Sequence, residues 1–416
     1  MNKARTKVYK VCVVTSVPAA REPRAPKHVV AVLEAMPDAE VYFVDMMGLN
    51  ENFNDPLELQ GHSHLHRLTL RVPTRKSAPI GWAFRKFLTL ISSRLFVTKN
   101  WVTPGILGAR AVGLAGVLRR VRADLYIAHN IETLMPTAIA AKANRAKLIF
   151  DCMEFYGDMG DSQTTMASAA TKHIEAAILP RCDLVLATSE SLAEALSGIY
   201  KIPKPLVLQN VPPIIRSLPE KRIHKGLRLY WRNSTIGFGQ RGLDDALVAL
   251  TLLPTDIVLS IQGRLRHEDA RPLYARIHEL NLTSRVTILS EYALGEAVAM
   301  AALHDAGLCL ERRGPANHEY TTSNKLFDYM MAGLAVIVPD LDGLSRAVKH
   351  AGAGLIYKAC SPQSLAEKVL ILYRNPTYLK GFAEASRAYA MAGGNLEHEM
   401  TKLKVALLAV AGANKL

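Results

Sequence analysis

The sequence predicts two α/β domains, each built on a parallel sheet. Apolar runs typical of strands alternate with helical segments along the whole chain, which is the pattern of a sheet wound with crossover helices. The alternation stops at residues 211–226, where prolines and charged residues cluster without periodicity. A length of 416 residues with 49% hydrophobic residues is enough for two or three such cores. These observations predict a domain over residues 1–210, a linker over 211–226 and a second domain after it.

The first predicted domain contains six strand-like runs separated by helical segments. The basic start of the chain is interrupted by Lys10 and lacks a small-residue cleavage site, so we expect a first strand there and no signal peptide. The predicted strands cover residues 7–17, 39–45, 123–129, 146–151, 183–189 and 205–210, with helices at 26–36, 134–144 and 191–200 among the segments between them.

The second predicted domain, residues 227–385, repeats this alternation. Its strands are expected at 227–231, 256–263, 285–290, 306–311, 335–340 and 353–357, with a helix at 243–253 after the first of them. The last segment, 386–416, reads as helices, and we expect it to pack back toward the first domain. Two parallel-sheet domains predict a ligand site at the carboxyl ends of their strands.

One run in the second domain, residues 323–344, is the most informative part of the chain. Ser323 is placed to cap a helix that begins Asn324, Lys325, and a short buried strand closed by Pro339 follows. The free N–H groups of a helix start, together with an ammonium group, favour binding of a phosphate. An ordinary helix–strand unit of an α/β domain gives the same pattern, so a purely structural role for this run is the alternative.

Polar residues and glycines follow several predicted strands. Glycine beside arginine suits a diphosphate, because the backbone approaches closely and a guanidinium binds two oxygens. No Walker loop or dinucleotide glycine fingerprint is present, which argues against an ATPase or a dehydrogenase. The candidate residues are His129, Asp151 and Glu154 in the first domain, and Arg232, Gly239, Arg241, Gly263 and Arg264 in the second.

The chain carries a formal net charge of +14, with 51 Lys and Arg against 37 Asp and Glu, which favours an anionic partner. The segment from Trp82 to Lys99 combines bulky apolar and basic residues at helical spacing, as a helix lying on an anionic membrane surface does; a helix packed on a sheet is the alternative. No nucleic-acid-binding signature is present. Five scattered cysteines without metal-ligand spacing predict free thiols in the cytoplasm, with a peripheral place on the inner membrane face if the basic helix binds lipid.

Several segments, in this order along the chain, resemble motifs of the family 4 glycosyltransferases, which have the GT-B fold. They are ADLYIAHNIETLMP, DCMEFYGD, ATSESLAEAL, LQNVPP, LYWRNSTIGFGQRGL, LSIQGR and SNKLFDYMMAGLAVIVPDLDGL. The resemblance implies two Rossmann-like domains facing across a cleft. It also implies metal-independent transfer of a sugar, with retention of configuration, from a nucleotide-diphosphate sugar to an acceptor, without a cofactor. The acceptor is expected to be lipid-linked or a glycan of a bacterial surface polysaccharide.

The resemblance also implies roles for individual residues. Arg241 and Lys325 match the cations that stabilise the leaving diphosphate, Asp328 matches the acid that binds the ribose, and His129 matches a histidine beside the reacting sugar. The remaining nucleotide-sugar positions are Arg232, Gly239, Gly263, Arg264, Glu311, Ser323 and Asn324. On the acceptor side, Arg24 matches an arginine of part of the family. Asp151 and Glu154 are expected either to orient the acceptor or the loop, or to serve only in folding.

The sequence departs from the family at one acidic position. Most members carry two glutamates eight residues apart, but here the partner of Asp328 is Tyr320, with Glu319 one residue out of register. Either Glu311 or Glu319 replaces the missing carboxylate, or another subgroup's geometry applies. Three functions therefore remain: a transferase acting on a lipid-linked acceptor, the same chemistry on a soluble acceptor, or a non-catalytic nucleotide-sugar-binding or scaffold protein.

Overall fold

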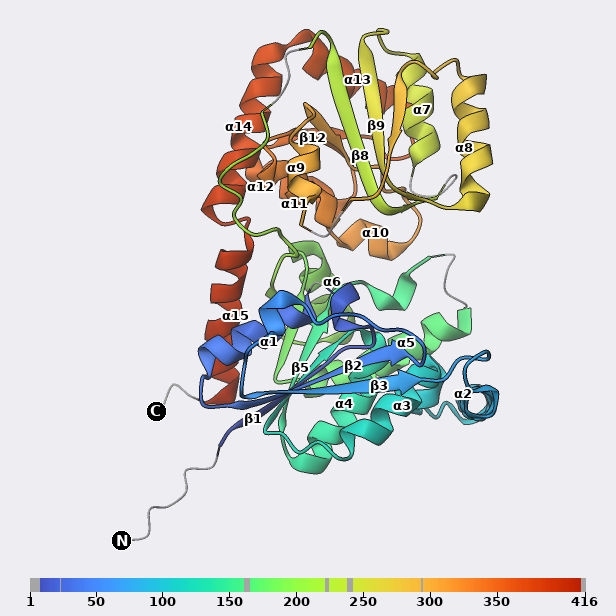
Figure 1. Ribbon diagram of the computed structural model, residues 1–416, viewed down its shortest axis with the longest axis vertical. Coiled ribbons are helices and arrows are strands. Elements are labelled where there is room, and N and C mark those ends of the chain that lie inside the picture. Colours follow the sequence, from blue (N-terminus) through green and yellow to red (C-terminus); the bar gives the residue numbers. More distant parts are fainter. Residues whose placement is uncertain are drawn as a thin grey trace. The chain divides into compact units, whose positions relative to one another are not determined.

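The structure, a computed structural model, describes residues 8–22, 24–160, 165–220, 224–237, 242–292 and 295–412. The chain divides into two compact units (Figure 1). Unit 1 contains Met1–Leu208 together with Met400–Leu416, and unit 2 contains Gln209–Glu399. The division after Leu208 lies two residues from the predicted boundary. Of the predicted C-terminal segment 386–416, the part up to Glu399 groups with unit 2 and the rest with unit 1.

Unit 1 is built on a seven-stranded sheet in which every strand pair is parallel. The strand order is β3-β2-β1-β4-β5-β6-β7, so the direction of winding reverses between β1 and β4. The strands are β1 (Lys10–Val14), β2 (Glu40–Gly48), β3 (Leu65–Val72), β4 (Leu125–His129), β5 (Lys147–Cys152), β6 (Leu184–Ala187) and β7 (Leu206–Val207).

Helices cover this sheet. They are α1 (Ala25–Ala35), α2 (Pro79–Lys99), α3 (Ala109–Leu118), α4 (Ile131–Asn144), α5 (Thr165–Ile178), α6 (Glu190–Tyr200) and α15 (Leu396–Ala411). Leu403 and Leu407 of α15 are fully buried in the same core as Val29 and Val32 of α1 and the sheet residue Val11. Short 3-10 helices occupy Ala19–Arg21, Leu57–Leu59, Pro104–Leu107, Tyr156–Asp158 and Leu179–Arg181.

Unit 2 is built on a second parallel sheet, of six strands in the order β10-β9-β8-β11-β12-β13. Its winding reverses between β8 and β11, as it does between β1 and β4 in unit 1. The strands are β8 (Leu227–Ile236), β9 (Ile257–Leu265), β10 (Val286–Leu289), β11 (Ala306–Leu308), β12 (Ala335–Pro339) and β13 (Gly354–Tyr357).

Two apolar clusters fill the two faces of this second sheet. Neighbouring residues of β12 alternate between them: Ile337 belongs to one cluster, and Val336 and Val338 belong to the other. Helices α7 (Leu243–Thr251), α8 (His267–Glu279) and α13 (Pro362–Arg374) contribute to the first cluster. Helices α9 (Ala297–Ala301), α11 (Asn324–Met331), α12 (Asp342–Ala351) and α14 (Pro376–Ala392) contribute to the second, and α10 (Ala316–Tyr320) precedes α11.

The structure confirms the two predicted parallel sheets and adds one strand that the sequence did not predict. This strand, β3, is an edge strand whose residues alternate between half-buried and exposed. It lacks the continuous apolar run that marks the inner strands, so the apolar criterion missed it. The described part of 211–226 contains no helix or strand, as expected of a linker.

Candidate functional site

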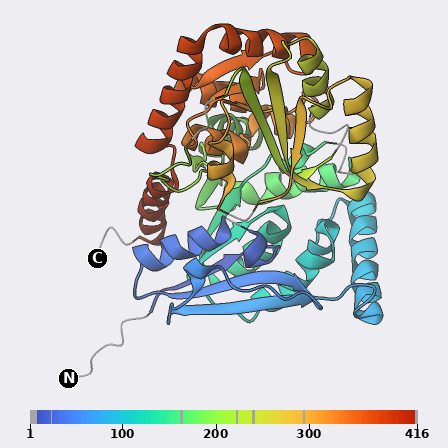
Figure 2. The same cartoon turned by 45° about the horizontal axis from the view of Figure 1, so that its top comes forward.

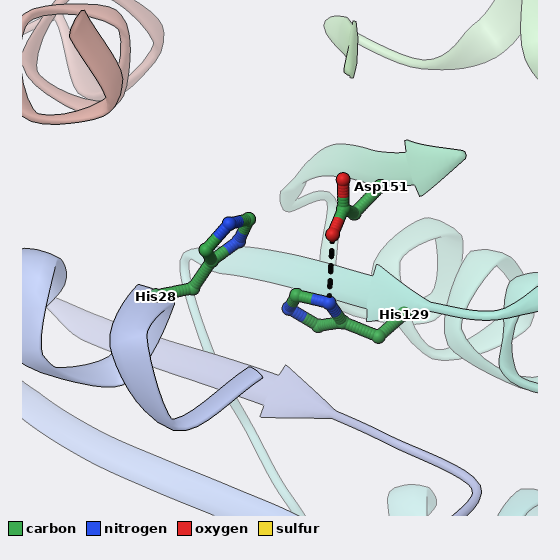
Figure 3. Close-up of side chains that lie close together, drawn as sticks. All are labelled: His28, His129 and Asp151. Atoms are coloured by element: carbon green, nitrogen blue, oxygen red, sulfur yellow. Dashed lines mark ion pairs between the residues drawn. The ribbon is translucent and has the colours of Figure 1, made fainter. Parts of the chain in front are cut away.

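In unit 1, three predicted residues meet at the carboxyl ends of the central strands. Arg24 precedes α1 in the connection after β1, His129 is the last residue of β4, and Asp151 lies near the end of β5. The guanidinium of Arg24 donates from Nε to Asp151 Oδ2 at 2.6 Å and from Nη2 to Asp151 Oδ1 at 2.9 Å. His129 Nδ1 lies 3.0 Å from Asp151 Oδ2 (Figure 3). The three side chains are buried and form one charged cluster at the point where the winding of the sheet reverses.

The cluster includes a histidine that the sequence did not single out. His28 of α1 is fully buried, and its ring centroid lies 4.7 Å from that of His129. Among the residues that the structure describes, neither ring nitrogen of His28 has a hydrogen-bond partner, and the 3.0 Å contact of His129 does not have hydrogen-bond geometry. Burial lowers the pKa of His28 well below its usual value, which keeps this ring neutral. His28 occupies the buried stripe of α1 with Ala25, Val29 and Val32, and that helical spacing is the signal that could have identified it.

The charge of Asp151 is set by its neighbours. Burial acts to raise its pKa, but the positive charge of Arg24 outweighs this effect and holds the pKa well below its ordinary value. Asp151 is therefore an ionised carboxylate inside the fold, and its charge is balanced by Arg24. Arg24 is fixed further by a bond from Nη2 to the carbonyl oxygen of Leu208, at 3.0 Å.

His28, His129 and Asp151 could in principle bind a metal ion, because one ligand atom of each lies within 4.8 Å of the others. Their chemistry does not favour one. Both carboxylate oxygens of Asp151 already accept hydrogen bonds from Arg24, so a divalent cation would sit beside a buried guanidinium. The group therefore fits a buried ion-pair cluster better than a metal site.

Glu154 lies outside this cluster. It follows β5 by two residues and is half-buried, and its backbone oxygen accepts a hydrogen bond from the N–H of Tyr156 at 3.0 Å. The structure thus brings together Arg24, His129 and Asp151, and it places Glu154 two residues beyond the end of β5.

In unit 2, the predicted cation Lys325 is buried at the start of α11. Its ammonium pairs with Glu311, which follows β11, and both side chains are less than a tenth exposed. Since β11 lies at the reversal point of the second sheet, this pair occupies the position where open α/β sheets bind ligands. Glu311 is therefore committed to Lys325.

A second ion pair joins β8 to α11. Arg232 of β8 pairs with Asp328 of α11, and each side chain is 13% exposed. Arg232 Nη1 also donates to the hydroxyl of Tyr292 at 2.7 Å, and the Arg232 backbone N–H donates to the hydroxyl of Tyr329 at 3.1 Å. Four predicted residues (Arg232, Glu311, Lys325 and Asp328) are thus linked in two pairs around one helix. Tyr292 follows β10 and had no sequence signal of its own.

The start of α11 differs from the sequence expectation in one detail. Ser323 is the N-cap residue, but its side chain makes no capping hydrogen bond. The backbone carbonyl of Ser323 accepts instead from the N–H of Leu326 at 3.0 Å. Asn324 is exposed at the first helical position. The first turn of α11 therefore has no side-chain cap from its own N-cap residue.

The glycine and arginine candidates of β9 have different surroundings. Gly263 has a φ of +148°, and a Cβ atom there would lie 2.0 Å from the carbonyl oxygen of Asn233 on β8. A glycine at this position lets the two backbones of β8 and β9 approach closely. The approach occurs where the pairing of the two strands shifts register, between Arg232 and Thr235 of β8. Arg264 is exposed. Gly239 and Arg241 lie outside the described residues.

Of the two carboxylates considered for the missing position, Glu319 is held by other groups. It accepts from the N–H of Asp342 at 3.1 Å and from Arg313 Nη1 at 3.2 Å. Tyr320, which stands at the family's glutamate position, is the last residue of α10.

One known protein family matches the second half of the chain. The family model for glycosyl transferases group 1 matches residues 238–389, which lie in unit 2, and a glycosyltransferase is the class of enzyme that the sequence predicted. No curated protein matches the sequence.

Solved structures of glycosyltransferases have the same fold over almost the whole chain. HepE from Anabaena, in complex with UDP, is 14% identical with a TM-score of 0.67, covering 97% of this chain and all of HepE. Sucrose-phosphate synthase from Thermosynechococcus elongatus is 13% identical with a TM-score of 0.70, covering 97% and 100%. WaaG, a glycosyltransferase involved in lipopolysaccharide biosynthesis, is 14% identical with a TM-score of 0.62, covering 96% and 99%. The predicted GT-B fold is confirmed.

Proposed function

We propose that this protein is a retaining, metal-independent glycosyltransferase of family 4 that transfers a sugar from a nucleotide-diphosphate sugar to a lipid-linked or glycan acceptor. The observation that carries the proposal is the match of residues 238–389 to glycosyl transferases group 1, in the unit where Lys325 and Arg232 lie at the reversal point of the sheet. HepE, which has the same fold, was crystallised with UDP and with UDP-glucose.

The proposed chemistry assigns one task to each group of residues. Departure of the nucleoside diphosphate develops negative charge, and fixed cations stabilise it most where water is excluded. Lys325 and Arg241 supply these cations, and the uncapped first turn of α11 adds its N–H groups. Asp328 accepts the ribose hydroxyls. In unit 1, His129 contacts the transferred sugar, and Arg24 fixes the carboxylate of Asp151 beside it.

The test is turnover of a panel of nucleotide sugars by the purified protein, with the anomeric configuration of the product read by NMR. We expect a retained anomer and undiminished activity after treatment with a chelator. Lys325→Gln and Arg241→Ala should each reduce kcat about a hundredfold or more, the effect of removing one preorganised charge donor. Lys349→Ala, at the exposed end of α12, is the control and should be unaffected. An inverted product, or activity that requires an added divalent cation, would overturn the corresponding part of the proposal.

The second candidate is a nucleotide-sugar-binding protein without turnover. Tyr320 favours it, because the carboxylate that most of the family holds near the sugar is absent and Glu311 and Glu319 are both engaged elsewhere. Calorimetry separates the two functions. Binding of a nucleoside diphosphate without transfer or hydrolysis of any nucleotide sugar supports this candidate, and turnover excludes it.

We further propose that α2 rests on an anionic membrane surface. Its outer stripe exposes Ile80, Phe84, Phe87 and Leu90 by 57–87%, and α2 lies at the outer edge of unit 1 in both views (Figures 1 and 2). Basic residues accompany this stripe, including the exposed Lys86 and Arg94. The proposal places the enzyme on the cytoplasmic face of the membrane, with a soluble acceptor as the alternative if α2 does not bind lipid. Among the described residues, no helix has both the length and the apolar character required to cross a bilayer.

Flotation with phosphatidylglycerol-containing vesicles tests this membrane contact. The double variant Phe84→Ser, Leu90→Ser should lose flotation. Leu57→Ser, which changes an even more exposed apolar residue outside α2, should keep it. Added salt should weaken binding, because headgroup attraction is screened. Flotation that survives both the double variant and salt would refute the role of α2.

A further inference from the structure

A large pocket opens in unit 1 at the end of the sheet away from His129. Its volume is 920 Å³, within the range of pockets that hold small organic ligands. It lies at the start of β5, beside Leu148, whereas the charged cluster lies near the end of β5 at Asp151. The pocket is therefore separate from the candidate catalytic residues.

The walls of the pocket are mainly apolar. Helix α4 supplies Met135 and Ile139, α5 supplies Ile174 and Ile178, and Trp101 lies in the segment after α2. Trp101 is 60% exposed and Ile139 is 45% exposed, so apolar surface reaches solvent at the mouth. An apolar occupant of this pocket would remove that surface from water.

The charged residues of the pocket are all basic. Lys142 and Arg181 line it with His173, and no Asp or Glu is among its lining residues. Both Lys142 and Arg181 are exposed and have no ion-pair partner within the residues that the structure describes. Two unpaired cations beside an apolar cavity match a ligand with an apolar chain and an anionic end.

The pocket is continuous with the exposed surface of α2. Phe96 of α2 packs edge-on against His173, with ring centroids 6.0 Å apart. Lys99 Nζ lies 5.0 Å from the ring centroid of Trp101. The helix that exposes apolar side chains and the mouth of the pocket therefore belong to one surface.

We propose that this pocket holds the acyl chain of an anionic membrane lipid, with the headgroup bound by Lys142 and Arg181. The location of the lipid in a membrane rests on the proposed contact of α2, whereas occupancy of the pocket does not. Stable attachment to a membrane takes two weak signals. The basic apolar surface of α2 supplies one, and a captured acyl chain supplies the second.

The test uses monomeric lysophosphatidylglycerol below its micelle concentration, with binding to the full chain followed by calorimetry. We expect saturable binding that weakens about fourfold for each methylene removed, since burial of each methylene contributes a fixed free energy. Ala177→Trp, which fills the pocket from α5, should abolish binding. Ala176→Trp, at the exposed neighbouring position outside the pocket, should leave it intact. Equal binding by these two variants, or affinity independent of chain length, would overturn the proposal.

The headgroup contact and the membrane contact are tested separately. Lys142→Ala with Arg181→Ala should remove the preference for lysophosphatidylglycerol over the zwitterionic lysophosphatidylcholine; a preference that persists would refute the headgroup site. The Phe84→Ser, Leu90→Ser variant should still bind the monomeric lipid while losing vesicles. Monomer binding lost in this variant would show that α2 itself is the lipid site, and would overturn the assignment to the pocket.

Discussion

Asp151 is the buried carboxylate to which both Arg24 and His129 of unit 1 lie close. It is fully buried and ionised, and its stability inside the fold depends on Arg24. We expect Asp151→Asn to lower the free energy of unfolding by about 3–5 kcal/mol, because the buried guanidinium of Arg24 would lose the carboxylate that accepts from its Nε and Nη2. Asp183→Asn, which breaks a surface pair with the half-exposed Lys147, should cost about 1 kcal/mol or less. Urea unfolding of the two variants measures the difference, and equal losses would contradict this account.

The free energy of unfolding should depend on pH through Glu175, a buried carboxyl group of α5. Burial raises its pKa to about 7, although a hydrogen bond from Tyr200 and the charge of Lys172 oppose the shift. Because the folded state holds the proton more tightly, stability is greatest below the unfolded pKa and falls as pH rises from about 4.5 through 7. Removing the charge in Glu175→Gln should eliminate this loss, which amounts to about 3 kcal/mol. Unfolding free energies of both proteins across this pH range test it; parallel pH profiles would refute it.

Sequence motifs identified several residues of the candidate site. They missed residues that only tertiary contacts bring to it. Arg24, His129 and Asp151 stand in recognisable segments, and the structure brings them together. His28 was missed because one histidine in an apolar stripe resembles a core residue. Tyr292 was missed because only the fold brings it to Arg232, 60 residues earlier in the chain.

Among the elements, the β8–β9 pair determines where Arg232 lies. Gly263 allows the carbonyl of Asn233 to approach at the register shift. Gly263→Ala should therefore destabilise unit 2 by several kcal/mol, since a backbone clash cannot relax by side-chain rotation. Gly381→Ala is the matched control: it lies within α14 with open space around it, and should stabilise by about 0.5–1 kcal/mol. Thermal unfolding compares the two, and a stable Gly263→Ala protein would contradict the role of this glycine.

The elements also show where sequence patterns are sufficient. Inner parallel strands are buried on both faces, so their continuous apolar runs identified β4, β5 and β12. The edge strand β3 is only half-buried and carries basic residues between its apolar ones, so it has no such run. The composition of α2 predicted a basic, apolar helix. Which of its apolar side chains are exposed to solvent depends on how the helix packs in the fold.

At the scale of the whole molecule, the last helix closes the core of the first unit. The chain leaves unit 1 after Leu208 and returns at Met400, so residues at the two ends of the sequence share one core. Helical periodicity identified a C-terminal helical segment, but not which of its residues group with each unit. That division depends on contacts between residues nearly 400 positions apart, which no local pattern encodes.

This return predicts that α15 stabilises unit 1 selectively. Leu403 and Leu407 are fully buried, so each Leu→Ala change should cost about 2–5 kcal/mol. Val405→Ala, on the exposed side of the same helix, should change stability by about 0.5 kcal/mol or less. Hydrogen exchange followed by mass spectrometry should show faster exchange in β1 and β4, with β8 and β9 unchanged, because the two leucines pack into the core of unit 1. Equal acceleration in both sheets, or an equal effect of Val405→Ala, would show that α15 does not act through that core.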